Sequence, residues 1–191
     1  MIKLEQYAVQ DENAVKKIDG IGKDAEIVTN EKGGKQSKSP MAMHLLDPEY
    51  LKDVFEDMSL SIDSPYNMTE LERTQYELAR AGMQITDGMI DPVNIINCID
   101  RAMYLIQPDL FKQITEIAKV LQYGAERYAV NNWRLIPQEE HINHALIHLI
   151  AAMMGDTQDD HINHCLTRLM MARATEQSEG FSYTEYIGKG E

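Results

Sequence analysis

One octet of residues occurs twice in this chain, 20 positions apart. The first copy is EEHINHAL at 139–146 and the second is DDHINHCL at 159–166. Residues three and four apart share one face of a helix, so each copy places an acidic residue and a histidine on the same stripe. A short turn at Gly155-Asp156 separates the copies, which is typical of two antiparallel helices. The octets therefore predict a helical hairpin with a polar face.

The spacing of apolar residues predicts further helices before this hairpin. Proline or Asp-Pro pairs begin several of them, and glycine is expected to end two. The expected helices begin at Pro48, span Thr69–Ala81 up to Gly82, begin at Asp91-Pro92, run from Pro108 to Gly124, run from Pro137 to about Met154, and run from about Gln158 to Thr175. Only 25–29 reads as a short extended piece. We predict an all-α helical bundle in which the antiparallel hairpin carries the site.

Composition narrows the classes of partner. A chain of 191 residues favours one core, and its net charge of −13 argues against binding a nucleic-acid polymer. A single nucleotide stays possible, because a bound cation neutralises its phosphates locally. No apolar run reaches the roughly 18 residues of a membrane span, and the N-terminus lacks the apolar stretch of a signal peptide. With only two cysteines, a cytoplasmic, reduced setting without membrane contact is the expectation.

The repeated acids and histidines indicate a divalent-metal site. We predict Glu140, His144, Asp160 and His164 as metal ligands, because mixed carboxylate and imidazole sets suit Mn²⁺, Fe²⁺, Co²⁺, Ni²⁺ or Zn²⁺. Mg²⁺ fits if water and phosphate supply most ligands. In an antiparallel pair, matching positions of the two copies do not meet directly. They converge either across a dimer or with His148 and Asp160 as the nearer pair, and the sequence leaves both open.

Other side chains of the octets have possible roles in catalysis or substrate binding. We predict Glu139, or His148 just after the first octet, as the general base. Asn143 and Asn163 are predicted to contact either the metal ligands or the substrate. The alternative is structural: acids in a first helical turn favour the helix dipole. Thr157-Gln158-Asp159-Asp160 also resembles a capping box with Asp in place of Glu.

A basic, glycine-bearing stretch at 32–40 stands out in an acidic chain. Lysine side chains and glycine N–H groups can hold phosphate oxygens, although most such stretches are solvated loops. We assign substrate binding to Lys32, Gly33, Gly34, Lys35, Lys38, Arg127 and Trp133. Trp133 and Tyr128 are candidates to stack on a base, although a lone tryptophan is more often part of a core.

Several motifs in order resemble a known family. They are Lys32-Gly33-Gly34-Lys35-Gln36-Ser37, Tyr123-Gly124 with Arg127-Tyr128, Asn132-Trp133-Arg134, and the two octets joined through Gly155-Asp156. Together they look like the phage-encoded dATP/dGTP diphosphohydrolase N-terminal-domain family over 32–46 and 107–175, and in outline like the MazG-like all-α NTP pyrophosphohydrolases. The resemblance implies hydrolysis of a purine deoxynucleoside triphosphate to monophosphate and pyrophosphate, with Mg²⁺ as in the MazG-like enzymes. The mixed ligand set adds Mn²⁺, and also Co²⁺ or Zn²⁺, as expected metals. The setting implied is the cytoplasm of a phage-infected bacterium.

The resemblance also suggests how the chain is organised. We predict a polar segment 1–31, a hydrolase-like domain 32–46 plus 107–175, an inserted helical segment 47–106, and a tail 176–191. A hairpin core of this size is expected to need a partner subunit, so we predict a homodimer or larger homo-oligomer.

Two alternatives to a pyrophosphohydrolase of this family remain. Asn143 and Asn163 stand where the MazG-like pattern has acids, which fits a non-catalytic phage protein that sequesters a signalling nucleotide made by host defence. An HD-type phosphohydrolase is disfavoured, because the chain has no His-Asp doublet.

Overall fold

The structure is a computed structural model that describes residues 18, 20, 25–60 and 68–179. Its helices are α1 (Pro48–Leu60), α2 (Glu70–Ile90), α3 (Ile95–Ile106), α4 (Leu110–Arg127), α5 (Gln138–Met153) and α6 (His161–Glu179). Two short strands, β1 (Ile27–Thr29) and β2 (Lys35–Ser37), complete the described elements together with 3₁₀ turns. The predicted all-α bundle is confirmed.

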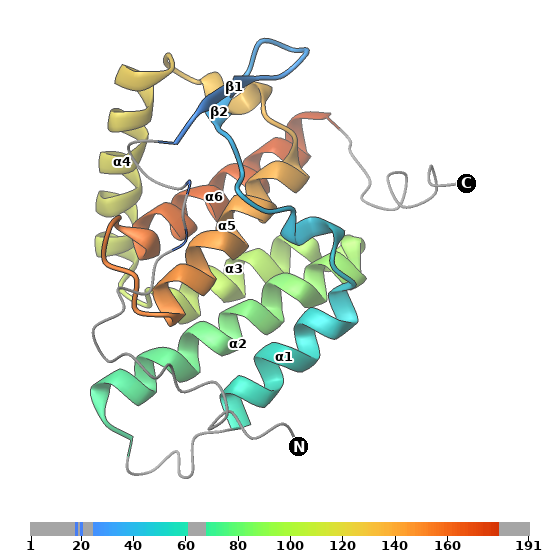
Figure 1. Cartoon of the computed structure of the whole chain (residues 1–191), viewed down its shortest axis with the longest axis vertical. Coiled ribbons are helices and arrows are strands. Elements are labelled where there is room, and N and C mark those ends of the chain that lie inside the picture. Colours follow the sequence, from blue (N-terminus) through green and yellow to red (C-terminus); the bar gives the residue numbers. More distant parts are fainter. Residues whose placement is uncertain (1–17, 19, 21–24, 61–67, 180–191) are drawn as a thin grey trace.

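The helical hairpin lies at the centre of the molecule. Helices α5 and α6 pack along each other, α1–α3 cover one side of the pair, and α4 packs against α6 on the other side (Figure 1). Every residue of α5 from His141 to Leu149 is buried. A polar helix face in such a position requires partners for its imidazoles and amides.

Helices α1 to α3 share the hydrophobic core of the hairpin. Phe55 of α1, Ile85 of α2 and Ile99 of α3 belong to the same buried cluster as Leu146 of α5 and Leu166 of α6. The segment predicted as an insertion is thus packed into the common core. Its status as an insertion stays a prediction.

The prediction that Gly82 ends a helix was wrong. Helix α2 passes through Gly82 and continues to Ile90. A Cβ atom at position 82 would lie 2.6 Å from the ring of Phe55, so glycine there allows α1 to approach α2 closely. Packing between helices, which sequence spacing does not show, explains this glycine.

The prediction that Gly124 ends a helix was also wrong. Helix α4 runs on to Arg127, and a Cβ at position 124 would meet nothing within 4 Å. Glycine is a weak helix former but does not stop a helix whose other residues favour it.

A β-hairpin replaces the loop expected over much of 32–40. Strands β1 and β2 pair antiparallel, with Val28 opposite Gln36. Gly33 has a φ of 81°, and the N–H groups of Gly33 and Gly34 donate to the main-chain carbonyl and the side-chain oxygen of Asn30. The glycines therefore shape a tight turn, and both N–H groups are used within it.

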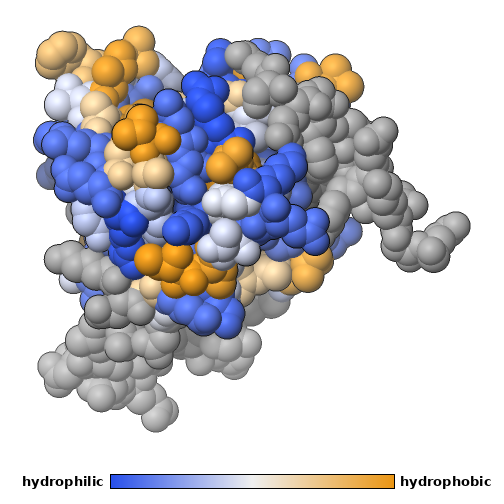
Figure 2. Space-filling model, turned by 90° about the horizontal axis from the view of Figure 1, so that it is seen from above, coloured by the Kyte–Doolittle hydropathy of each residue, from blue (hydrophilic) through white to orange (hydrophobic). Residues whose placement is uncertain are grey.

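The hairpin is attached to the turn before α5. Asn132 bonds both the N–H and the carbonyl of Lys35, at 2.8 Å and 2.5 Å. A Cβ at Gly34 would lie 2.8 Å from the carbonyl oxygen of Leu135, so the two segments touch through their backbones. Seen from this end, the surface is mostly hydrophilic with small hydrophobic patches (Figure 2). Within the described residues, no helix combines the length and apolar character that crossing a membrane requires.

Candidate functional site

A cavity of about 600 Å³ lies where the β-hairpin, α4 and the two octet-bearing helices α5 and α6 meet. Its wall includes Lys35 and Ser37 of β2, the residues of α4 from Ala118 to Arg127 other than Lys119 and Glu126, and the turn that carries Trp133. Helices α5 and α6 contribute polar side chains from both octets. This volume is in the range of pockets that hold small organic ligands.

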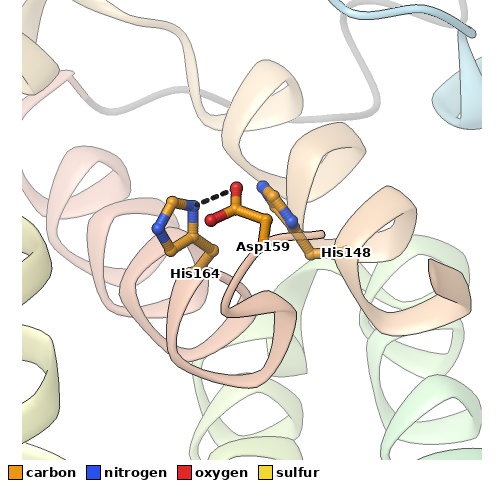
Figure 3. A group of neighbouring side chains, drawn as sticks. All are labelled: His148, Asp159 and His164. Atoms are coloured by element: carbon orange, nitrogen blue, oxygen red, sulfur yellow. Dashed lines mark ion pairs between the residues drawn. The ribbon is translucent and has the colours of Figure 1, made fainter. Parts of the chain in front are cut away.

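Three side chains in the cavity wall converge in the arrangement expected of metal ligands. His148 comes from α5, Asp159 from the connection after it, and His164 from the first turn of α6 (Figure 3). One ligand atom from each residue lies within 4.8 Å of the others. The two helices are antiparallel, so the end of α5 meets the start of α6, and His148 is the histidine of α5 that reaches the second octet.

The two histidines of this trio favour the neutral form. Burial lowers the pKa of His148 well below its ordinary value, with His164, Arg168 and His161 acting in the same direction. Burial also lowers the pKa of His164, against the opposing influence of Asp159. A neutral imidazole keeps a lone pair on one ring nitrogen, which is the form that binds a metal ion.

Asp159 supplies the oxygen of the trio. Its Oδ1 accepts a hydrogen bond from the N–H of Asp160 at 2.9 Å. Its Oδ2 is buried 3.5 Å from Nδ1 of His164 and accepts no hydrogen bond from the described residues. A buried carboxylate oxygen in this position needs a cation or a donor. Two imidazoles and one carboxylate fit a borderline transition-metal ion or Zn²⁺, with open positions for substrate.

A cation also lies in the cavity wall. Arg168, on α6, forms no ion pair with a carboxylate among the described residues, and its Nη1 bonds Nδ1 of His141 at 3.2 Å and Oε1 of Gln36 at 3.5 Å. Burial lowers the pKa of Arg168 to about 10, so the guanidinium remains charged at neutral pH. The charge of Glu140 acts on Arg168 from a distance, and Gln36 bonds both side chains. A partly buried guanidinium that no described carboxylate contacts directly is suited to phosphate.

His141 orients Arg168. Burial and the charge of Arg168 lower the pKa of His141 to about 3. Its Nδ1 can therefore accept the hydrogen bond from Arg168, while Nε2–H donates to the carbonyl of Trp133 at 3.0 Å. This network fixes the guanidinium at the cavity.

The four predicted metal ligands occupy different places. His164 belongs to the trio, whereas Glu140 accepts a hydrogen bond from Gln36 at 3.2 Å and does not line the cavity. Asp160 is exposed and bonds the side chain of Asn163 at 2.7 Å. It also accepts from the N–H of Asn163, which makes it the cap of α6. The structural alternative thus describes Asp160 better than the metal prediction.

His144 lines the cavity, and one of its ring nitrogens has a partner outside the trio. Nε2 lies within hydrogen-bond distance of Oγ of Ser39, at 2.9 Å. The neighbouring Asn143 accepts from the N–H of Met43 and donates to Ser39 and Met41. These two residues attach the segment after β2 to α5.

The remaining predicted residues of the octets are less central. Glu139 is half-buried and does not line the cavity. Asn163 donates to Asp160 and, at 3.5 Å, to Glu116 of α4. His148 is the predicted base that faces the cavity.

The basic stretch contributes one lysine to the cavity wall. Lys35 lines it, whereas Lys38 pairs with Glu26 at 3.0 Å and Lys32 is exposed outside it. Arg127 and Trp133 both line the cavity. Arg127 donates to the hydroxyl of Tyr123, and Trp133 is half-buried beneath the guanidinium of Arg134 at 4.4 Å.

The structure adds Asp159 and Arg168 to the residues that the sequence pattern singled out. Asp159 and Asp160 are neighbours in the sequence. Which of them faces His148 depends on the residue at which α6 begins, and the sequence did not show that residue. Arg168 follows His164 by one helical turn, so its position on the same face was visible in the sequence. The sequence did not show that no carboxylate of the described residues would contact it directly.

With this geometry established, comparison with protein families is informative. Residues 100–182 match the dATP/dGTP diphosphohydrolase, N-terminal family. The trio and Arg168 all lie within the segment that this family model matches, whereas the β-hairpin with Lys35 lies outside it. The resemblance noted from the motifs is confirmed over these residues. Searches of curated proteins and of solved structures found no significant match.

Proposed function

We propose that this protein hydrolyses a purine deoxynucleoside triphosphate to the monophosphate and pyrophosphate, with a divalent metal ion. The family match supports the class of reaction, since its description names a diphosphohydrolase of dATP and dGTP. The observation that carries the proposal is the combination in one cavity wall of the trio His148, Asp159 and His164 with the guanidinium of Arg168. We further propose that it acts in the cytoplasm of a phage-infected bacterium.

The trio would hold the metal ion. When bound there, a divalent cation would polarise phosphoryl oxygens and lower the pKa of an attacking water. His148 and His164 offer neutral nitrogens, and Asp159 offers the one negative charge. The donor set fits Mn²⁺, Co²⁺ or Zn²⁺ better than Mg²⁺, which prefers oxygen ligands.

Arg168 would bind the phosphate chain. Its planar guanidinium, oriented by His141, can give two parallel hydrogen bonds to phosphate oxygens. Lys35 of β2 also lines the cavity and adds a second positive charge. These cations compensate locally for the chain's net charge of −13, which otherwise disfavours an anionic substrate.

The apolar and aromatic part of the cavity would receive the base. Tyr128 and Trp133 line it next to Leu121 and Ile136. Aromatic rings stack on a purine, and apolar walls exclude water from the reacting end. Glu139 lies outside this cavity wall, so we assign it no part in the reaction.

We also keep the proposal of a homodimer or larger homo-oligomer. Helix α4 supports it, because Leu110, Phe111 and Ile114 are exposed by 60%, 82% and 66%. Light scattering would measure the mass in solution. A monomer at all accessible concentrations would contradict this proposal.

The activity can be tested with purified protein and dATP or dGTP in the presence of Mg²⁺, Mn²⁺ or Co²⁺. Ion-exchange chromatography should resolve monophosphate and pyrophosphate as the products. His164→Ala should lose the activity. Release of inorganic phosphate, or products unaffected by His164→Ala, would contradict the proposal.

A non-catalytic nucleotide-binding role is the second candidate. One observation favours it: Asp159 is the single carboxylate among the described residues that line the cavity. A site with one carboxylate holds metal and triphosphate less firmly than one with several. Retention of nucleotide on the protein without turnover, under the same conditions, would favour this role over hydrolysis.

A further inference from the structure

Two buried polar residues outside the cavity wall are joined to His148. Nδ1 of His161 lies 3.0 Å from Nδ1 of His148, within hydrogen-bond distance. On the other side of the same ring, Nε2 of His161 lies 3.5 Å from Oδ1 of Asp156. Asp156 and His161 are exposed by only 7% and 3%. A line of buried groups thus runs from a carboxylate through one imidazole to another.

Asp156 is held as a fixed carboxylate at the start of this line. Its Oδ1 accepts from the N–H of Gln158 at 2.8 Å, and its Oδ2 accepts from the N–H of Ile18 at 3.0 Å. Burial raises the pKa of Asp156, but these two hydrogen bonds and His161 outweigh burial and hold it below its ordinary value. Nε2 of His161 lies 3.5 Å from this carboxylate without a hydrogen bond. An ionised carboxylate repels a nitrogen lone pair and attracts an N–H, so a proton on His161 is favoured on the nitrogen that faces Asp156.

The positions of the protons then follow along the line. When the ring of His161 carries a single proton on Nε2, its Nδ1 has a lone pair. The hydrogen bond between the two Nδ1 atoms consequently needs its proton on His148. Neutral His148 then has no proton on Nε2, and this nitrogen is the one left to join Asp159 and His164.

We propose that Asp156 and His161 are positioning residues that fix His148 in the Nδ1–H tautomer and so leave its Nε2 lone pair to bind metal. Metal-binding histidines generally donate their second ring N–H to a fixed acceptor, which sets both the tautomer and the ring orientation. Here that acceptor is a second histidine, itself oriented by a carboxylate. This inference rests on the metal site of the proposed function.

The tautomers can be measured directly in the metal-free, full-length protein. Long-range ¹H–¹⁵N correlation NMR distinguishes protonated from unprotonated ring nitrogens, and the chain has only six histidines. His148→Gln and His161→Gln would assign the two spin systems. We expect His148 to be protonated at Nδ1 and His161 at Nε2. Protonation of His148 at Nε2 would overturn the proposal, whatever the variants show.

Metal affinity provides a second measurement. Co²⁺ titration followed by visible absorption should show His161→Leu weakened by roughly 10–100-fold, because His148 then lacks its acceptor. His161→Gln should bind Co²⁺ more tightly than His161→Leu, since its amide oxygen can accept the same proton. Equal affinity of His161→Leu and the unchanged protein would overturn the proposal. If His161→Leu does not fold, the tautomers of the unchanged protein decide.

These measurements separate the inference from the proposed function. The expected tautomers together with Co²⁺ binding, but without nucleotide hydrolysis, would support the positioning role and refute the enzyme. Failure of the unchanged protein to bind Co²⁺ would refute the metal site and the positioning role with it. Hydrolysis together with the opposite tautomer would refute the positioning role alone.

Discussion

At the scale of single residues, two adjacent acids have different roles. Asp159 turns its Oδ2 toward His164, whereas Asp160 caps α6 through the N–H of Asn163. One position along the chain thus separates a candidate metal ligand from a structural cap. Sequence spacing placed Asp160 on the face of His164, because it assumed that the helix began near Gln158. The helix begins at His161, which leaves Asp159 in the connection, free of helical geometry.

A matched pair of substitutions tests this difference. Asp159→Asn should weaken Mn²⁺ or Co²⁺ binding by at least about 100-fold and reduce hydrolysis in parallel, since the one charged ligand is lost. Asp160→Asn should leave both nearly unchanged, because Asn is as good a helix cap as Asp. Isothermal titration with the metal and the nucleotide assay measure the two effects. The reverse order of effects would restore Asp160 as the ligand.

Arg168 provides the second prediction at this scale. Arg168→Met should raise the KM for the nucleotide by roughly 10–100-fold, the worth of charged hydrogen bonds to phosphate. The KM of Arg168→Lys should lie between those of the unchanged protein and Arg168→Met, because lysine keeps the charge but lacks the planar guanidinium. Arg173→Met is the control: Arg173 pairs with Asp100 outside the cavity. Steady-state kinetics that show Arg168→Met unchanged would exclude a phosphate-binding role.

At the scale of helices and strands, the sequence predicted where helices begin better than where they end. Pro48, Pro108 and Pro137 stand at or next to helix starts, since proline tolerates the first turn. Gly82 and Gly124 were interpreted as ends, although one packs against Phe55 and the other is simply tolerated. The β-hairpin was missed because its pairing depends on the Asn30 turn and on contact with 132–136. Neither leaves an alternating pattern in three-residue strands.

The two glycines form a natural comparison. Gly82→Ala should destabilise the protein by roughly 1–3 kcal/mol, because the added methyl group overlaps the buried ring of Phe55. Gly124→Ala should stabilise it by about 0.5–1 kcal/mol, since α4 gains helix propensity in open space. Urea denaturation gives both free energies of unfolding. Equal effects at the two positions would show that the close approach of α1 and α2 is absent in solution.

At the scale of the whole molecule, buried histidines make stability depend on pH. The pKa of His141 falls from its ordinary value of 6.5 to about 3 on folding, so the unfolded chain binds its proton more readily between these values. The contribution of His141 is fully present above about pH 6.5 and declines as pH falls toward 3. The free energy of unfolding changes by up to about 1.4 kcal/mol per pH unit from this one proton.

This contribution can be measured by denaturing the unchanged protein and His141→Gln at several pH values between about 4 and about 7.5. The unchanged protein should lose stability more steeply toward acid than the variant does. Parallel curves would show that His141 is not buried in neutral form.

The overall architecture could be predicted because helical periodicity and the repeated octets are local signals. The all-α class and the central antiparallel hairpin both follow from such signals. The site could be predicted only in part. His148 and His164 followed from spacing, whereas the use of His144, Asn143 and Glu140 in bonds to 36–43 depends on contacts about 100 residues apart. Such contacts are set by the packing of the bundle, which one sequence does not reveal.

Anomalous diffraction from crystals soaked in Mn²⁺ tests the metal site most directly. One strong manganese peak should lie between Nε2 of His148, a carboxylate oxygen of Asp159 and a ring nitrogen of His164, and Asp159→Asn should remove it. A peak at Glu140 or Asp160, or no peak in the cavity at saturating Mn²⁺, would contradict the proposed site.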